Sequence, residues 1–185
     1  VLETTGELQN TWIVFTSDHG EMLGDHGLWS KAVWYEQAVH VPCMVRPADG
    51  LLQHKTGWHS TALIEQLDVP ATVLDIAGAQ SLTGSLGCSL LPYVAMSPGD
   101  AAASTGKEAV LSELFGETTV ITDDYKLTVK CEDDKPRQLF DLNKDPNEQR
   151  NVVEEPGYAA DIEAIVRAHL DPVRHRINNE QLSEY

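Results

Sequence analysis

The tripeptide Asp-His-Gly occurs twice in one short stretch, as 18–20 and again seven residues later as 25–27. Carboxylate oxygens and imidazole nitrogens are both common ligands of divalent metals. The first copy directly follows an apolar run, TWIVF at 11–15, and ligands of open α/β sheets bind beyond the carboxyl ends of strands. Gly20 permits a backbone turn that would bring both side chains to one point. We therefore expect Asp18 and His19 to supply two metal ligands, with an ordinary strand-ending turn as the alternative.

The second copy, Asp25-His26-Gly27, follows no strand. It would join the same site only if residues 21–30 folded back onto the end of the strand. We favour a hydrogen-bonded loop instead, in which Gly24 and Gly27 take backbone angles that other residues avoid.

The elements that must position these residues indicate an α/β fold. TWIVF is typical of a strand buried on both faces, as in a parallel sheet covered by helices, and 40–47 is a second strand candidate. Residues 60–78 suggest two helical pieces, the second framed by Asp68 and Gly78. Residues 79–108 are expected to form a long connection, with a helical turn at 89–95.

Beyond residue 108 the pattern changes to short strands with turn signals between them, which predicts a small antiparallel sheet. The predicted strands are AVLSELF, TTVIT, YKLTVK and RQLFDL, at 109–115, 118–122, 125–130 and 137–142. Residues 157–176 form a helix whose apolar stripe should pack on this sheet, and Pro172 should bend or end it. We expect a catalytic α/β part at 1–100 and a C-terminal subdomain at 101–185.

The bulk composition excludes two classes of partner. The net charge of −16 over 185 residues argues against nucleic acid, whose phosphates need Lys and Arg. No run approaches the 18 apolar residues of a membrane span. Three widely separated cysteines, Cys43, Cys88 and Cys131, are expected to be buried free thiols.

The stretch TSDHGEMLGDHGLWSKAVWYEQAVHVPCMV at 16–45 strongly resembles the sulfatases of the alkaline phosphatase-like superfamily. The closest pattern is the Asp-His type of iduronate sulfatase, choline sulfatase and phosphonate monoester hydrolases. The segment QLFDLNKDPNEQRNV at 138–152 is similar to another family pattern, near the C-terminus. The chain thus resembles the C-terminal portion of a sulfatase, with part of that family's sheet, flanking helices and a small antiparallel sheet.

The resemblance implies a role for several residues. Asp18 and His19 match divalent-metal ligands, and Lys31 matches the lysine that contacts the sulfate or phosphonate group. Such a lysine is expected to be catalytic and substrate-binding, because it would stabilise negative charge in the transition state. His26 is expected to stand behind the ligands rather than among them. Calcium, magnesium, manganese and zinc all remain possible metals.

The family's nucleophile is a formylglycine made from cysteine in a C-x-P-x-R or C-x-A-x-R pattern, and none of the three cysteines has these neighbours. The resemblance implies that this nucleophile and two further metal-binding aspartates lie in an N-terminal part absent from this chain. We therefore expect a sulfate ester hydrolase acting on small anionic esters, with the isolated chain inactive. The half-covered TWIVF strand should associate with that missing part or with another copy. A phosphonate monoester or phosphodiester hydrolase, or a non-catalytic module, is the alternative.

Overall fold

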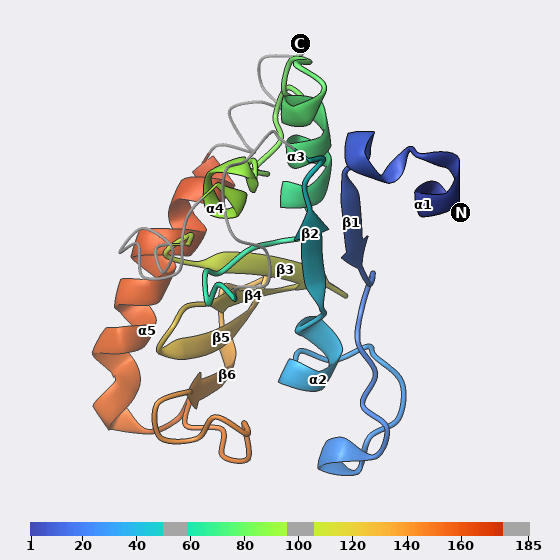
Figure 1. Ribbon diagram of the computed structural model, residues 1–185. Coiled ribbons are helices and arrows are strands. Elements are labelled where there is room, and N and C mark those ends of the chain that lie inside the picture. Colours follow the sequence, from blue (N-terminus) through green and yellow to red (C-terminus); the bar gives the residue numbers. More distant parts are fainter. Residues whose placement is uncertain (50–58, 96–105, 176–185) are drawn as a thin grey trace. The chain divides into compact units, whose positions relative to one another are not determined.

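The computed structural model describes residues 1–49, 59–95 and 106–175 (Figure 1). The chain divides into two compact units, the first made of residues 1–20 and 40–107 and the second of residues 21–39 and 108–185. The domain boundary expected between residues 100 and 101 lies outside the described residues and stays a prediction. No helix in the described ranges combines the length and apolar character that a bilayer span requires.

The first unit contains a two-stranded sheet. It begins with α1 (Leu2–Thr5) and η1 (Leu8–Asn10), which lead into β1 (Ile13–Thr16), and β1 pairs with β2 (Cys43–Arg46). Both expected strands are confirmed, but the pairing is antiparallel and β1 is not buried on both faces. Phe15 is 55% exposed and Met44, its cross-strand partner, is 58% exposed.

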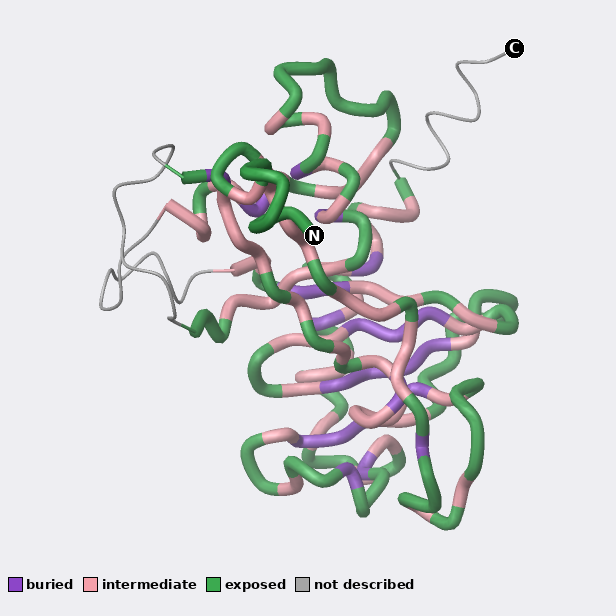
Figure 2. The backbone as a smooth tube through the Cα atoms, turned by 45° about the vertical axis from the view of Figure 1, so that its right-hand side comes forward, coloured by how far each residue is buried: buried purple, intermediate pink, exposed green. Residues whose placement is uncertain are grey.

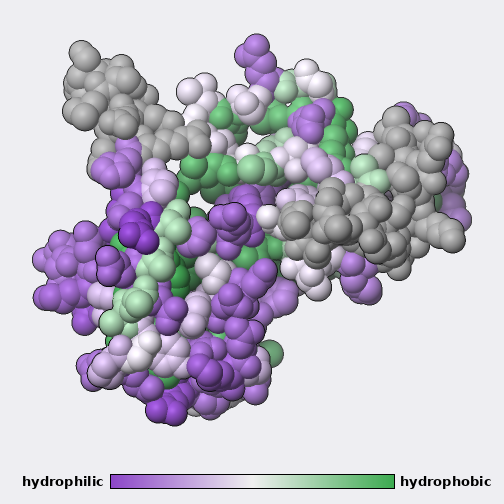
Figure 3. All heavy atoms as spheres, turned by 90° about the vertical axis from the view of Figure 1, so that its left-hand side faces the viewer, coloured by the Kyte–Doolittle hydropathy of each residue, from purple (hydrophilic) through white to green (hydrophobic). Residues whose placement is uncertain are grey.

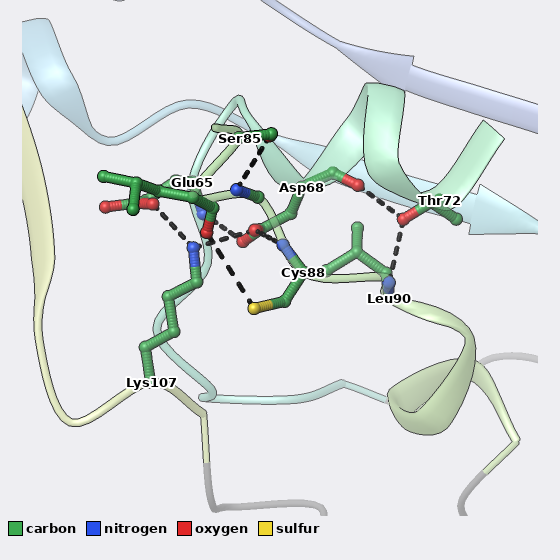
Figure 4. A network of polar contacts seen from close by, with 9 residues as sticks. Glu65, Asp68, Thr72, Ser85, Cys88, Leu90 and Lys107 are labelled. Carbon is green, nitrogen blue, oxygen red and sulfur yellow. Dashed lines mark hydrogen bonds and ion pairs between the residues drawn. The ribbon is translucent and has the colours of Figure 1, made fainter. Parts of the chain in front are cut away.

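Helix α3 (Asp68–Ile76) is anchored at its start by a buried carboxylate (Figure 4). Asp68 accepts hydrogen bonds from the backbone nitrogens of Glu65 and Cys88, both at 2.7 Å. It also pairs with the Lys107 ammonium at 2.8 Å. Asp68 is only 1% exposed, and a buried carboxylate is stable only when its oxygens have hydrogen-bond or ion-pair partners. The carboxylate therefore ties the helix start to two distant segments of the first unit.

Of the two helical pieces expected at 60–78, only the second is helical. The prediction for 60–65 is wrong because its backbone bonds elsewhere: the Leu63 carbonyl accepts from the Lys107 nitrogen at 3.2 Å. The helical turn expected at 89–95 is present as α4 (Leu91–Val94).

The second unit is built on a four-stranded antiparallel sheet in the order β3-β4-β5-β6. The strands are β3 (Val110–Leu114), β4 (Glu117–Ile121), β5 (Tyr125–Lys130) and β6 (Pro136–Asp141). The expected hairpin turn at Asp123-Asp124 is confirmed, and the Thr122 nitrogen donates to the Tyr125 carbonyl at 2.9 Å across it. The small antiparallel sheet predicted from the sequence is therefore present.

The core of the second unit lies between this sheet and the C-terminal helix. Val120, Leu127 and Leu139 are fully buried and pack with Ile165 and Leu170 of the helix. Figure 2 shows buried residues concentrated along these strands. Figure 3 views the molecule from the side that carries α5, and hydrophilic residues cover most of the lower part of this view. The helix thus turns an apolar stripe inward, as its sequence spacing predicts.

The helix continues past Pro172 instead of ending there. After η4 (Pro156–Tyr158), α5 (Ala159–Ile165) passes into a π-helical segment, η5 (Val166–Leu170), and residues 171–175 are helical. Proline lacks the N–H that an α-helical bond would use, and a π-helical turn changes the bonding pattern just before it. The wider turn explains how the chain accommodates Pro172 inside a helix.

Residues 21–39 also belong to the second unit. They contain η2 (Asp25–Gly27) and α2 (Glu36–Val39). The backbone nitrogen of Met22, a residue that is 1% exposed, donates to the Ser30 carbonyl at 3.0 Å and closes the loop of residues 22–30, which contains η2. The mixed α/β class is thus confirmed, with one two-stranded and one four-stranded sheet and a C-terminal helix.

Candidate functional site

Asp18 and His19 lie just beyond the carboxyl end of β1, in the first unit. The Asp18 Oδ2 and His19 Nε2 atoms are 3.4 Å apart. The Asp18 side chain is 85% exposed and the His19 side chain 36% exposed. The two side chains therefore converge on one solvent-accessible point rather than pointing to opposite faces.

Local hydrogen bonds orient both side chains. His19 Nδ1 lies 2.7 Å from the Gly20 carbonyl oxygen, so Nδ1 carries the proton and Nε2 keeps its lone pair. Asp18 Oδ1 accepts from the His19 backbone nitrogen at 3.0 Å. Ser17 Oγ donates to the His19 carbonyl at 2.8 Å. The lone pair of the imidazole and one carboxylate oxygen are thus both directed at the shared point.

This pair of atoms fits a divalent cation. Neighbouring ligands at bonds of about 2.1–2.4 Å and right angles lie about 3.0–3.4 Å apart. Within the described ranges, no group of three or more His, Cys, Asp and Glu side chains is placed to hold a metal. The described residues therefore bring together two candidate donors, Asp18 and His19, and no third.

Gln66 supports this strand end, although no local pattern in the sequence predicts this contact. Its side-chain nitrogen donates to the Ser17 carbonyl and lies 3.4 Å from Thr16 Oγ1. Gln66 stands two residues before Asp68, the first residue of α3, whereas Ser17 follows β1. Only the fold of the first unit brings these segments together.

Lys31 lies in the second unit. It is exposed and directly follows the loop that the Met22–Ser30 hydrogen bond closes. Ser30 has a φ of 74°, a conformation uncommon for a residue with a side chain. A tight turn follows, in which the Val33 nitrogen donates to the Lys31 carbonyl at 2.8 Å. In the part of the chain that the structure describes, the Lys31 ammonium has no hydrogen bond or ion pair, so it is available to an anion.

His26 occupies the tip of the same loop. It has a φ of 51° inside η2, and its ring stacks on Tyr35 with centroids 3.9 Å apart and planes 14° apart. The second tripeptide thus forms a bonded loop, as expected. The role of His26 behind the metal ligands stays a prediction, as do the roles of Asp18, His19 and Lys31.

A polar cavity of about 250 Å³ lies beside this loop, within the second unit. Asp25, His26, Gln37, Asn147 and Gln149 line it. Among the described residues, the buried His26 Nε2 and Gln37 Oε1 atoms have no hydrogen-bond partner. A water molecule in the cavity could form these hydrogen bonds.

The three cysteines are free thiols. The expectation that all are buried is wrong, because Cys88 and Cys131 are exposed and Cys43 is only partly buried. Burial raises the pKa of the Cys43 thiol, and the nearby Asp68 charge raises it further. A raised pKa disfavours the thiolate, so Cys43 is not an activated nucleophile.

Residues 24–176 match the protein family described as N-sulphoglucosamine sulphohydrolase, C-terminal. This match covers most of the chain. The chain belongs to this sulphohydrolase family.

Two curated sulfatases show the same relationship over most of the chain. The N-acetylglucosamine-6-O-sulfatase of Bacteroides thetaiotaomicron is 34% identical over 166 residues, covering 85% of this chain and 29% of that protein. The choline-sulfatase of Rhizobium meliloti is 36% identical over 163 residues, covering 84% of this chain and 29% of that protein. The chain therefore has sulfatase homologues.

A solved structure supports the fold of the chain. The phosphonate monoester hydrolase from Silicibacter pomeroyi superimposes with a TM-score of 0.77 at 31% identity, covering 96% of this chain and 37% of that one. The chain thus spans about a third of the length of the proteins it matches. The expectation that this chain belongs to the sulfatases, within the alkaline phosphatase-like superfamily, is confirmed.

Proposed function

We propose that the protein containing this chain hydrolyses sulfate esters with the help of a divalent metal. The observation that carries the proposal is the 3.4 Å convergence of Asp18 Oδ2 and His19 Nε2 at the end of a strand. Membership of the sulphohydrolase family and sulfatase homologues support the reaction class. The proposed metal is calcium, or alternatively magnesium, manganese or zinc, all of which accept oxygen and imidazole ligands.

In this proposal Asp18 and His19 hold the cation. When bound, the cation would stabilise negative charge that develops on the ester during hydrolysis. His19 Nδ1 lies at hydrogen-bond distance from the Gly20 carbonyl oxygen, so the neutral ring presents the lone pair of Nε2 to the cation. Further ligands would come from residues outside this chain.

Lys31 binds the anionic group of the substrate in this proposal. Its ammonium is exposed and would hold an ester oxygen through a charge-assisted hydrogen bond. A formylglycine nucleophile would also come from outside the chain, because Cys43, Cys88 and Cys131 lack the required neighbours. The substrate is a small anionic ester, and we propose no nucleic-acid or membrane partner.

Substitution of Asp18 tests the metal assignment in the full-length protein. Losing a supporting partner of a ligand typically costs about 10–100-fold in metal affinity or activity, so losing the ligand itself in Asp18→Ala should cost at least about 100-fold in kcat/KM. Metal content, measured by elemental analysis, should fall together with the rate. The exposed Asp49→Ala, at the end of the β2 segment, is the control. Full rate and full metal content in Asp18→Ala would show that the assignment is wrong.

Phosphonate monoester hydrolysis is the second candidate, favoured by the likeness to the Silicibacter pomeroyi enzyme. The same Asp-His pair and lysine would serve both reactions, because both substrates are anionic esters. Initial rates on matched aryl sulfate and aryl phosphonate esters decide between them. A full-length protein that binds no divalent metal in a titration and cleaves neither ester would instead be a non-catalytic module.

A further inference from the structure

A buried lysine lies on the face of the four-stranded sheet that is turned away from α5. Along β5, Leu127 and Val129 pack into the core with α5. Side chains alternate between faces along a strand, so Lys126 and Thr128 point to the opposite face. Lys126 is nevertheless only 1% exposed, which means that another part of the second unit covers it.

Residues 21–39 provide this cover. Lys126 Nζ lies 3.3 Å from Glu36 Oε2, and Tyr35 packs on Phe140, with ring centroids 5.8 Å apart. Phe140 is the cross-strand neighbour of Lys126 on β6. Trp34 Nε1 adds a hydrogen bond to Glu117 of β4 at 3.1 Å. Three consecutive residues, 34–36, thus each contact a different strand of the sheet.

Glu148 completes the arrangement from the turn after β6. Its carboxylate forms an ion pair with Lys126, and its other oxygen accepts from the Glu36 backbone nitrogen at 2.8 Å. Both side chains of the Lys126–Glu148 pair are 1% exposed. Glu148 has a φ of 56°, and such strain in a residue with a side chain persists only where its surroundings enforce it.

We propose that the buried group of Lys126, Glu148 and Glu36, the clamp, is a positioning device for Lys31, an inference that rests on the proposed role of Lys31. Lys31 stands five residues before Glu36 and directly after Ser30, whose carbonyl is bonded to the buried Met22. Both flanks of Lys31 are therefore fixed, while its ammonium stays exposed. The sheet of the second unit sets where the anion-binding lysine stands.

Two variants test the clamp in the full-length protein. Lys126→Met alone leaves the buried Glu148 carboxylate without its cationic partner, so this variant can fail to fold. The double variant Lys126→Met/Glu148→Gln removes both charges and nearly keeps the shapes, and Glu36→Gln changes only the partly exposed member. Lys144→Met is the matched control, because Lys144 pairs with Asp141 and Tyr158, neither of which lies in residues 21–39.

Amide hydrogen exchange measures whether the clamp holds its segment. In the double variant and in Glu36→Gln, amides of residues 21–39 should exchange at least about tenfold faster, while those of β4 and β5 keep their protection, because local opening need not involve the whole sheet. Lys144→Met should leave residues 21–39 unchanged. Unchanged exchange in the double variant, or an equal rise throughout the sheet, would overturn the proposal.

Kinetics on an aryl sulfate then test the consequence for Lys31. Because small misplacement of a catalytic group can cost about 100-fold, the double variant should lose about 10–100-fold in kcat/KM, and adding Lys31→Ala should cause little further loss. Full additivity of the two losses would show that the clamp does not act through Lys31. If Lys31→Ala by itself retains full activity, the proposed role of Lys31 fails, whereas the exchange result still decides whether the clamp holds residues 21–39.

Discussion

At the scale of single residues, short hydrogen bonds to the chain's own backbone decide what a side chain can do. The hydrogen bond to the Gly20 carbonyl places the proton of the neutral His19 ring on Nδ1. The lone pair on Nε2 is then the one that can bind a cation. In the second unit, hydrogen bonds from other side chains act on Asp141. Its Oδ2 accepts from Lys144 Nζ at 2.7 Å and from the Tyr158 hydroxyl at 3.0 Å.

These partners make Asp141 a source of acid-dependent stability. The hydrogen bond from Lys144 lowers the pKa of Asp141 below its usual 3.8, with burial opposing and Tyr158 assisting. A lowered pKa in the folded state gives stability that is complete above pH 3.8 and is lost as the pH falls through the folded value. Urea midpoints of the wild type and Asp141→Asn should therefore converge at acid pH. A difference between the two midpoints that stays constant as the pH falls would contradict this role of Asp141.

At the scale of elements, segments distant in sequence fix where helices and loops begin. Helix α3 starts at Asp68 because that carboxylate is bonded to Glu65, Cys88 and Lys107. Burial alone would lower the pKa of Lys107, but its hydrogen bonds to Asp68 and Glu65 outweigh this and raise the pKa. Residues 21–39 are likewise held by contacts to β4, β5 and the turn after β6 rather than by their own short helix.

The start of α3 can be tested by stability. Asp68→Ala leaves Lys107 and two backbone nitrogens without their buried acceptor, which should lower the free energy of unfolding by about 3–5 kcal/mol. Asp75→Ala, at an exposed position of the same helix, should change it by less than about 0.5 kcal/mol. Chemical denaturation of both variants measures the difference, and equal effects would show that Asp68 does not anchor the helix.

At the scale of the whole molecule, the two-stranded sheet leaves apolar area uncovered. Phe15 and Met44 are cross-strand partners and are both more than half exposed. Neighbouring apolar side chains of this kind favour association, because each Å² removed from water contributes about 25 cal/mol. We propose that this surface is covered in the full-length protein by further sheet, or by another copy when the chain is alone.

Light scattering on the isolated 185-residue chain tests this proposal. The chain should self-associate as its concentration rises, and Phe15→Ser/Met44→Ser should shift it toward the monomer, because the substitutions remove the apolar pair. Phe115→Ser changes one residue that is 84% exposed at the β3–β4 turn and should have the smaller effect. A monomeric wild-type chain at high concentration would contradict the association.

The sequence by itself determined the elements whose signal is local. Turn residues and β-rich runs located all four strands of the second unit, and the apolar spacing of Ile162, Ile165 and Leu170 predicted the face that α5 buries. Asp18 and His19 were likewise placed at a strand end from adjacent residues alone. These features depend on periodicity and on near neighbours, which a sequence displays directly.

Only the tertiary structure decided what depends on contacts between distant residues. The pairing of β1 with β2, the absence of a helix at 60–65 and the support of Ser17 by Gln66 all rest on partners far along the chain. The burial of Lys126 is the clearest case. A lysine inside the run YKLTVK gives no local sign of burial, and its two carboxylate partners lie 90 residues before it and 22 after it. The desolvation cost of burying the lysine charge is offset only where the fold brings those carboxylates together.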